Sequence, residues 1–207
     1  MRSYQTTFLL SATDAAQFPA GNVPEVAFLG RSNVGKSSLI NALLGDRVAR
    51  VSSTPGRTRA INFFALHLQS PSRPELILAD LPGYGYARIS RSISAEWPTF
   101  IDPYLAGRDN LRACVCLVDL NVPPQDSDLQ LAEYLDSIGR ARIVVGTKAD
   151  KLSGNQRTVA ARKMQTALHA DNFVVCSAND GRGLSELWKA IRQAATGSSA
   201  ATEQPGP

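Results

Sequence analysis

The chain has 207 residues and a mild formal net charge of +4; 43% of its residues are hydrophobic, which is typical of one folded domain with a substantial core. The longest apolar run, 113–118, is too short to cross a bilayer, and the apolar stretch 8–10 is too short for a secretory signal. We therefore expect a cytoplasmic protein without a membrane partner. Cys114, Cys116 and Cys176 lack metal-ligand spacing, which indicates buried, reduced thiols.

Short apolar runs alternate with helix-forming stretches along most of the chain. Strands are expected at 25–29, 60–68, 75–79, 113–119, 142–146 and 172–176. Helices are expected at 36–44, 94–105, 126–138, 155–168 and 184–194. This alternation predicts an α/β fold, with a mostly parallel six-stranded sheet and helices on both faces. Only a short turn separates the second and third runs, so one strand should be antiparallel.

Three segments follow from this pattern. Residues 1–22 precede it and are expected to form an N-terminal extension, which could add a strand or a turn before the core. Residues 23–195 carry the alternation and form the predicted functional domain. Residues 196–207, TGSSAATEQPGP, lack apolar periodicity and are expected to be a disordered C-terminal tail.

A phosphate-binding motif lies between the first predicted strand and the first predicted helix. Residues 30–37, GRSNVGKS, match G-x-x-x-x-G-K-[ST]. Its glycines let backbone N–H groups turn toward phosphate oxygens, and the helix that follows adds its positive end. Lys36 is expected to reach the β- and γ-phosphates, and Ser37 to bind Mg²⁺. The motif predicts the P-loop NTPase fold and a nucleoside triphosphate, but it does not specify the base.

Two further segments suit the γ-phosphate end of such a site. Asp80-Leu-Pro-Gly83 follows a predicted strand, where Asp80 can hold the hydration shell of Mg²⁺ and the Gly83 N–H can approach the γ-phosphate. The polar loop 52–59 contains Thr54 and Thr58, and the hydroxyl of either could complete the Mg²⁺ sphere. Thr58 is favoured because it lies just before the next strand. A loop ordered by γ-phosphate and Mg²⁺ is a known switch design.

The base is indicated by Thr147-Lys148-Ala149-Asp150, which follows another predicted strand. A carboxylate at Asp150 accepts from both N1–H and N2–H₂ of guanine, whereas adenine would leave it unsatisfied. The stem of Lys148 can cover the base or the ribose. Cys176-Ser177-Ala178 follows the last strand, and a backbone N–H there can meet guanine O6. The order of these segments favours a GTP-binding protein over an ATP-using kinase.

Together, GRSNVGKSSLIN, TPGRTRAINFF, DLPGYGYA, TKADKL and the late CSA resemble the EngB family of bacterial GTPases over roughly residues 20–195. Thr147, which stands where most GTPases have Asn, agrees with this family. The resemblance implies a Mg²⁺-dependent GTPase that acts as a switch in assembly of the large ribosomal subunit and is needed for normal cell division and septation. Its expected partners are the large subunit or its precursor and ribosomal RNA, and it is expected to be a monomer.

The resemblance also implies a set of site residues. It places the metal on Ser37 and Thr58, and hydrolysis on Lys36, Thr58 and Gly83. The nucleotide contacts that it implies are Gly30, Arg31, Ser32, Asn33, Val34, Gly35, Lys36, Ser37, Gly56, Arg57, Thr58, Arg59, Ala60, Asp80, Leu81, Pro82, Gly83, Thr147, Lys148, Ala149, Asp150, Cys176, Ser177 and Ala178.

Two residues bear on the rate of hydrolysis. Tyr84 follows Gly83 directly, where many GTPases carry a Gln that orients the attacking water, so slow intrinsic turnover is expected. A GTP/GDP-binding regulatory module with negligible hydrolysis is the alternative function. Asn33 resembles an asparagine that ligates K⁺ near the phosphates in some related GTPases. The alternative is a loop asparagine that bonds its own backbone.

Basic residues are concentrated in one stretch of the sequence. Between Arg31 and Arg91 there are nine Lys or Arg and three Asp or Glu. Six of them exceed what one nucleotide requires, namely Arg47, Arg50, Arg57, Arg59, Arg88 and Arg91. We hypothesise that they contact ribosomal RNA, and the alternative is a solvated basic face.

Overall fold

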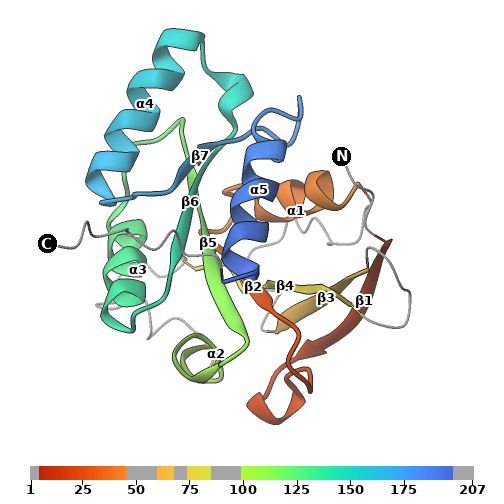
Figure 1. The fold of residues 1–207 in the computed structure, drawn as a ribbon. Helices are drawn as coiled ribbons and strands as arrows, with labels where there is room; N and C mark the ends of the chain where they lie inside the picture. Colours follow the sequence, from red (N-terminus) through yellow and green to blue (C-terminus); the bar gives the residue numbers. More distant parts are fainter. Residues whose placement is uncertain (1–4, 46–59, 68–73, 85–98, 198–207) are drawn as a thin grey trace, which may run out of the picture.

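The computed structural model describes residues 5–45, 60–67, 74–84 and 99–197 (Figure 1). Its strands form one seven-stranded sheet in the order β1-β3-β4-β2-β5-β6-β7. The strands are β1 (Gln5–Ala12), β2 (Glu25–Gly30), β3 (Ile61–His67), β4 (Leu76–Asp80), β5 (Leu111–Asp119), β6 (Arg142–Thr147) and β7 (Phe173–Val175). β3 runs antiparallel to both of its neighbours, and the remaining pairs are parallel. The predicted α/β architecture with one antiparallel strand is therefore confirmed.

The predicted number of six strands is wrong, because β1 adds a seventh at the sheet edge. Most residues of β1 are exposed, with Phe8 56% and Leu9 41% accessible, so its sequence lacks the buried run typical of an inner strand. Its pairing with β3 also shifts register between Phe8 and Leu10, which breaks strict alternation. Residues 5–12 thus belong to the same sheet as the predicted functional domain. The division at residue 22 stays a prediction.

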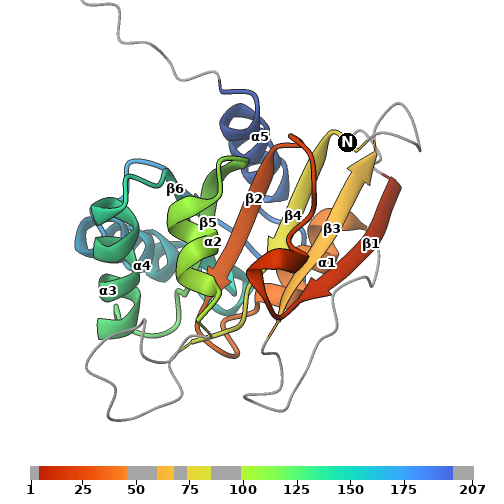
Figure 2. The same cartoon turned by 90° about the horizontal axis from the view of Figure 1, so that it is seen from below.

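Helices cover both faces of the sheet, as predicted (Figures 1 and 2). They are α1 (Lys36–Leu44), α2 (Ile101–Gly107), α3 (Asp126–Ser137), α4 (Gly154–Ala167) and α5 (Leu184–Ala195), with single 3-10 turns at Ala15–Gln17 and Ala149–Lys151. α1 and α5 bury their apolar sides on one face, and α2, α3 and α4 on the other. The predicted helix 94–105 corresponds to α2, and residues 94–98 lie outside the described residues.

The inner strands are apolar because helices cover them on both sides. All six residues of β2 are buried, and so are most residues of β5 and β6. Cys114, Cys116 and Cys176 are buried and free, which confirms the prediction of reduced thiols. Burial raises the pKa of the Cys114 and Cys176 thiols to about 12, so both stay protonated and unreactive at neutral pH.

A buried ion pair fixes the start of β2 to the segment that leads into β5. Glu25 is fully buried; it pairs with Arg108 and accepts a hydrogen bond of 2.8 Å from the Tyr104 hydroxyl. The Arg108 guanidinium also donates to the Pro19 carbonyl at 2.5 Å and lies 5.9 Å from the centre of the Phe18 ring. The residues before β2 are thereby held against the rest of the domain.

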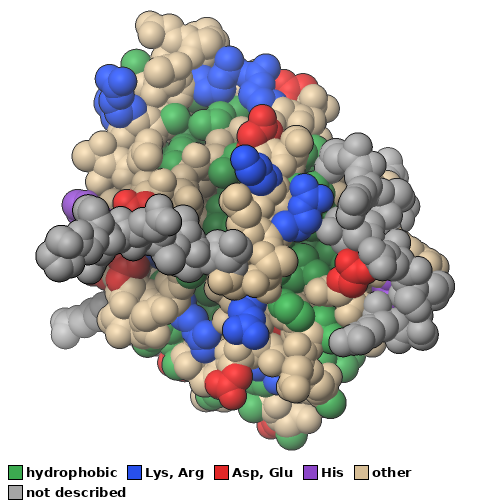
Figure 3. All heavy atoms as spheres, in the orientation of Figure 1, with side chains coloured by type: hydrophobic (Ala, Val, Ile, Leu, Met, Phe, Trp, Pro, Cys, Tyr) green, Lys and Arg blue, Asp and Glu red, His purple; other side chains and the backbone are tan. Residues whose placement is uncertain are grey.

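The surface carries charges of both signs. On the face shown in Figure 3, Lys and Arg side chains are scattered among acidic and apolar ones, and form no single patch within the part that the structure describes. Among the described helices, none is long and apolar enough to cross a membrane. The six arginines proposed to contact RNA, Arg47, Arg50, Arg57, Arg59, Arg88 and Arg91, lie outside the described residues.

Candidate nucleotide-binding site

Four parallel strands end at the same edge of the sheet, where ligands bind in folds of this type. Their last residues are Gly30 of β2, Asp80 of β4, Asp119 of β5 and Thr147 of β6. The first, second and fourth of these belong to predicted motifs. Segments far apart in the sequence therefore meet at one place.

The phosphate loop turns sharply between β2 and α1. Asn33 and Gly35 have φ values of 64° and 101°, and Gly35 is the N-cap of α1 without a side-chain cap. Gly35 needs its glycine for this conformation, which few L side chains adopt. At Gly30 a Cβ would lie 2.7 Å from Val34 Cγ1, so the loop also packs too closely for a larger residue. The first N–H groups of α1 face the loop, the arrangement that suits phosphate.

Lys36 and Asp80 form an ion pair although 44 residues separate them. Their side chains are only 11% and 8% exposed, so the pair lies between α1 and the end of β4. Ser37 is the next residue of α1. A hydroxyl and a carboxylate are the oxygen ligands that Mg²⁺ prefers alongside nucleotide phosphates. Ser37 and Asp80 therefore fit a magnesium ion carried by a nucleotide. Thr58, the other predicted ligand, lies outside the described residues.

Residues 80–83, here called the D-x-x-G segment, run beside the phosphate loop. The Ser32 N–H donates to the Tyr84 carbonyl at 3.1 Å, and the Tyr84 N–H to the Gly30 carbonyl at 3.4 Å. A Cβ at Gly83 would lie 2.8 Å from Ser32 Oγ and 3.3 Å from Ser32 Cα, so a larger residue would force Ser32 to shift. The structure thus brings together residues 30–37 and 80–83, as the motifs require.

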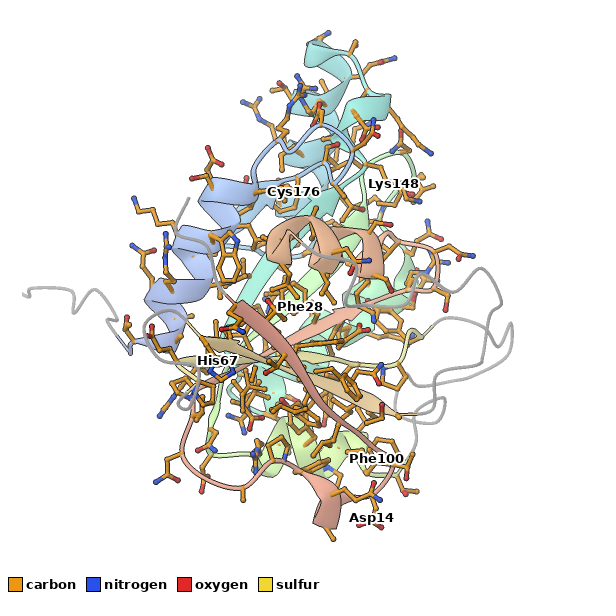
Figure 4. The ribbon with its side chains drawn as sticks, turned by 90° about the vertical axis from the view of Figure 1, so that its right-hand side faces the viewer. Asp14, Phe28, His67, Phe100, Lys148 and Cys176 are labelled. Carbon is orange, nitrogen blue, oxygen red and sulfur yellow. The ribbon has the colours of Figure 1, made fainter. Side chains whose placement is uncertain are left out.

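Two residues of the predicted guanine-binding segment 147–150, here called the base reader, form hydrogen bonds with the phosphate loop. The Thr147 hydroxyl, almost fully buried, lies 2.7 Å from the Val34 carbonyl. Lys148 has φ 56°, and its Nζ donates to the Asn33 carbonyl at 2.8 Å. These bonds join residues more than one hundred positions apart in the sequence and connect the two motifs directly. Figure 4 places Lys148 and Cys176 on the same side of α1.

The Asp150 carboxylate is oriented by the loop that follows β7. Its Oδ1 accepts from the Ser177 hydroxyl at 2.8 Å, and Asn179 Nδ2 lies 3.5 Å from its Oδ2. Ser177 is fully buried, and the Ala149 N–H donates to the Cys176 carbonyl at 3.2 Å. The predicted loops 147–150 and 176–178 therefore lie side by side. That Asp150 reads guanine stays a prediction.

Sequence reasoning missed Asp119, a carboxylate that contacts Lys148 of the base reader. Asp119 ends β5, and its Oδ2 accepts from Lys148 Nζ at 2.7 Å while its Oδ1 accepts from Asn121 at 2.9 Å. Burial opposes ionisation of Asp119, but the bonds from Lys148 and Asn121 outweigh it, and the pKa of Asp119 is lowered. The carboxylate thereby fixes the Lys148 side chain. An Asp at the end of an apolar strand, as at Asp80, was the available signal.

The Tyr84 side chain is buried in the core, although its sequence position directly after Gly83 suggests a place beside the γ-phosphate. Its side chain is 2% exposed, and its hydroxyl donates to Asp128 Oδ1 of α3 at 3.1 Å. Burial, followed by the charge of Asp128, raises the pKa of Tyr84 far above its usual value. Burial also raises the pKa of Asp128 to about 6, against the opposing effects of Tyr84 and Arg31.

The raised pKa of Asp128 predicts a pH-dependent stability. The folded chain binds this proton more tightly than the unfolded chain, whose Asp pKa is near 3.8. The stabilising effect is complete below the unfolded pKa and is lost as the pH rises through 6. In urea unfolding, Asp128→Asn should remove a loss of about 1 kcal/mol that the native chain shows between pH 5 and pH 7. Identical pH dependence in both proteins would contradict the assignment.

Some predicted contacts fall outside the part of the chain that the structure describes. They are Gly56, Arg57, Thr58 and Arg59, together with the alternative metal ligand Thr54. Of the predicted run 56–60, only Ala60 is described, as a half-buried residue directly before β3.

The parallel sheet and the phosphate loop between β2 and α1 define a P-loop nucleotide-binding protein, and the matching family model makes the class P-loop GTPases. A family model described as 50S ribosome-binding GTPase matches residues 25–148. A probable GTP-binding protein EngB of Acidobacterium capsulatum is 60% identical over 199 residues, which cover 95% of this chain and 94% of the relative. One of Streptococcus pyogenes serotype M18 is 41% identical over 195 residues, covering 92% and 95%. The chain therefore belongs to the EngB family of GTP-binding proteins.

Solved structures share the fold. The crystal structure of a probable GTP-binding protein EngB matches with a TM-score of 0.63 at 21% identity, covering 84% of this chain and 99% of that one. A single-residue variant of Aquifex aeolicus Era bound to GDP·AlF₄⁻ matches with a TM-score of 0.65 at 24% identity, covering 83% of this chain and 56% of Era. At these identities the likeness extends to the fold alone.

Proposed function

We propose that this chain is a slow GTPase that acts as a nucleotide-dependent switch in assembly of the large ribosomal subunit, and that cells need it for normal division and septation. One observation carries the nucleotide part of the proposal. Thr147 and Lys148 of the base reader bond the carbonyls of Val34 and Asn33 in the phosphate loop. A single guanine nucleotide can therefore meet Lys36 at its phosphates and Asp150 at its base.

Each side chain has a defined task in this proposal. Lys36 binds the β- and γ-phosphates, Asp150 accepts from the guanine edge, and Gly83 donates its N–H to the γ-phosphate. When bound, Mg²⁺ neutralises charge on the phosphates, and Ser37, Asp80 and Thr58 are the residues proposed to hold it or its waters.

The position of Tyr84 supports the proposal of slow turnover. Its hydroxyl is bonded to Asp128 in a buried place, so this side chain does not orient an attacking water. A GTP/GDP-binding module with negligible hydrolysis is the second candidate. We also propose that Asn33 helps to hold K⁺. Exchange of NaCl for KCl at fixed ionic strength should raise phosphate release, and equal rates in both salts would end the K⁺ proposal.

The proposed partner is the large ribosomal subunit or its precursor, and the proposed location is the cytoplasm, where the chain acts as a monomer. Support comes from the matching family model, whose description names the 50S particle, and from the concentration of arginines between Arg31 and Arg91. Arginine side chains bind RNA phosphates and release counterions from the RNA, so such binding weakens as the salt concentration rises.

The test is binding to purified large subunits in the presence of GDP or a non-hydrolysable GTP analogue, at several salt concentrations. We expect tighter binding with the analogue and a steep loss of affinity with salt. Small subunits serve as the control particle, and Lys36→Ala as the nucleotide-free control protein. Equal binding in both nucleotide states, or binding that salt leaves unchanged, would overturn the ribosomal role. Phosphate release with and without large subunits separates a slow GTPase from the module with negligible turnover.

A further inference from the structure

Helix α3 is tied to the γ-phosphate end of the site through one buried hydrogen bond. Tyr84 directly follows Gly83, and its hydroxyl donates to Asp128 Oδ1 at 3.1 Å. Asp128 lies in the first turn of α3 and is 5% exposed, while Tyr84 is 2% exposed. Bonds to an ionised group in such an environment are stronger than those between neutral groups.

The backbone of the same tyrosine is bound to the phosphate loop. Tyr84 and Arg31 form an isolated parallel bridge, made by the bonds that join Tyr84 to Gly30 and Ser32. A Cβ at Gly83 would lie 2.8 Å from Ser32 Oγ, so the segment before Tyr84 also runs close to the phosphate loop. Tyr84 is therefore bound to the phosphate loop by its backbone and to α3 by its side chain. It directly follows Gly83, the residue proposed to approach the γ-phosphate.

Arg31 adds charge to this buried group. Its positive charge lowers the pKa of both Asp128 and Tyr84, so it lies close enough to favour the carboxylate. Arg31 Nε is buried and, among the described residues, has no hydrogen-bond partner. The Arg31 backbone pairs with the Tyr84 backbone, and the Tyr84 hydroxyl donates to Asp128 of α3, so the phosphate loop and α3 are linked through Tyr84. A core that needed only packing would not require these polar groups.

We propose that Tyr84 and Asp128 are positioning residues, whose hydrogen bond holds Gly83 in place to receive the γ-phosphate. A segment that is already held loses less freedom when the phosphate binds, so the bond favours GTP over GDP and supports hydrolysis. GDP has no γ-phosphate, so its affinity gains little from the Tyr84–Asp128 hydrogen bond. The inference rests on the proposed role of Gly83 and is independent of the ribosomal partner.

The test compares variants that remove the bond with one that keeps it. Tyr84→Phe and Asp128→Ala should each lower the preference for a non-hydrolysable GTP analogue over GDP by about tenfold, and slow single-turnover hydrolysis by a similar factor. Asp128→Asn keeps an oxygen that accepts from the tyrosine but loses the charge, so it should lose less than Asp128→Ala, about threefold. The double variant Tyr84→Phe/Asp128→Ala should be no worse than either single change.

Tyr134→Phe is the matched control. It removes another tyrosine–aspartate bond of α3, of 3.1 Å to Asp102, in an exposed position. This variant should leave both nucleotide affinities unchanged. The proposal is overturned if the analogue and GDP lose affinity equally in Tyr84→Phe, or if neither changes while the melting temperature falls. If Tyr84→Phe does not fold, Asp128→Ala is compared with Asp128→Asn by the same ratio of analogue affinity to GDP affinity. The proposal is then overturned if this ratio is equal in the two variants. Since no ribosomal particle is present, failure here leaves the proposed ribosomal role standing.

Discussion

Asp150→Asn should weaken GTP binding by roughly two to four orders of magnitude and allow the chain to bind xanthosine triphosphate instead. The carboxylate would accept two hydrogen bonds from guanine, whereas an amide presents one donor and one acceptor. The Ser177 hydroxyl, which donates to Asp150 Oδ1 at 2.8 Å, can keep donating to the amide oxygen. The amide NH₂ then faces the base, where xanthine offers an acceptor oxygen and guanine a donor. Titration with fluorescent guanine and xanthine nucleotides measures both changes.

Asp180→Asn provides the matched control. Asp180 lies in the same loop region as Ser177, but it pairs with Arg182 at 3.3 Å and its side chain is 38% exposed. The same chemical change there should leave both affinities within about twofold, because surface pairs contribute little. Ser177→Ala should give an intermediate loss of GTP affinity, about tenfold, since Asp150 remains but loses its orienting donor. If Asp150→Asn retains native GTP affinity, the guanine reader lies elsewhere and the proposed function loses its main support.

Local signals in the sequence were enough to predict the central elements. The bounds of α1 were predicted correctly because Gly35 and Gly45, with φ values of 101° and 73°, stand at its two ends. Strands β2 and β5 are apolar throughout most of their length, and such runs indicate a sheet that is covered on both faces. Edge strand β1 gave no such signal, because most of its residues face solvent and only its pairing with β3 makes it a strand.

The same division between local and distant information applies to the site. Lys36, Gly83 and Asp150 lie in motifs whose spacing alone predicts phosphate and base contacts. The partners that orient the motif residues come from other strands and helices. Asp119 meets Lys148 across 29 residues, and Asp128 meets Tyr84 across 44. A single sequence carries no pattern for these pairs, because the order of strands in the sheet creates them.

The ion pair of Glu25 and Arg108 lies at the opposite end of β2 from Gly30, where the nucleotide site begins. Glu25 is fully buried, and its two oxygens accept from Arg108 and from the Tyr104 hydroxyl. Removal of one partner from a buried pair leaves an uncompensated charge, which costs far more than the pair contributes over an apolar replacement. A substitution at Glu25 should therefore lower the free energy of unfolding without changing nucleotide affinity.

Glu25→Ala should lower the free energy of unfolding by about 3–5 kcal/mol, because Arg108 keeps its charge in a largely buried place. Urea unfolding followed by circular dichroism measures the loss. Asp136→Ala is the control: Asp136 also accepts two bonds from an arginine, Arg142, at 2.7 and 2.8 Å, but its side chain is 55% exposed. That variant should lose less than about 1 kcal/mol. A loss in Glu25→Ala no larger than in Asp136→Ala would show that the buried pair does not hold the N-terminal segment. GDP affinity, measured at a temperature where Glu25→Ala is folded, should equal that of the native chain, since the substitution lies a whole strand away from the phosphate loop.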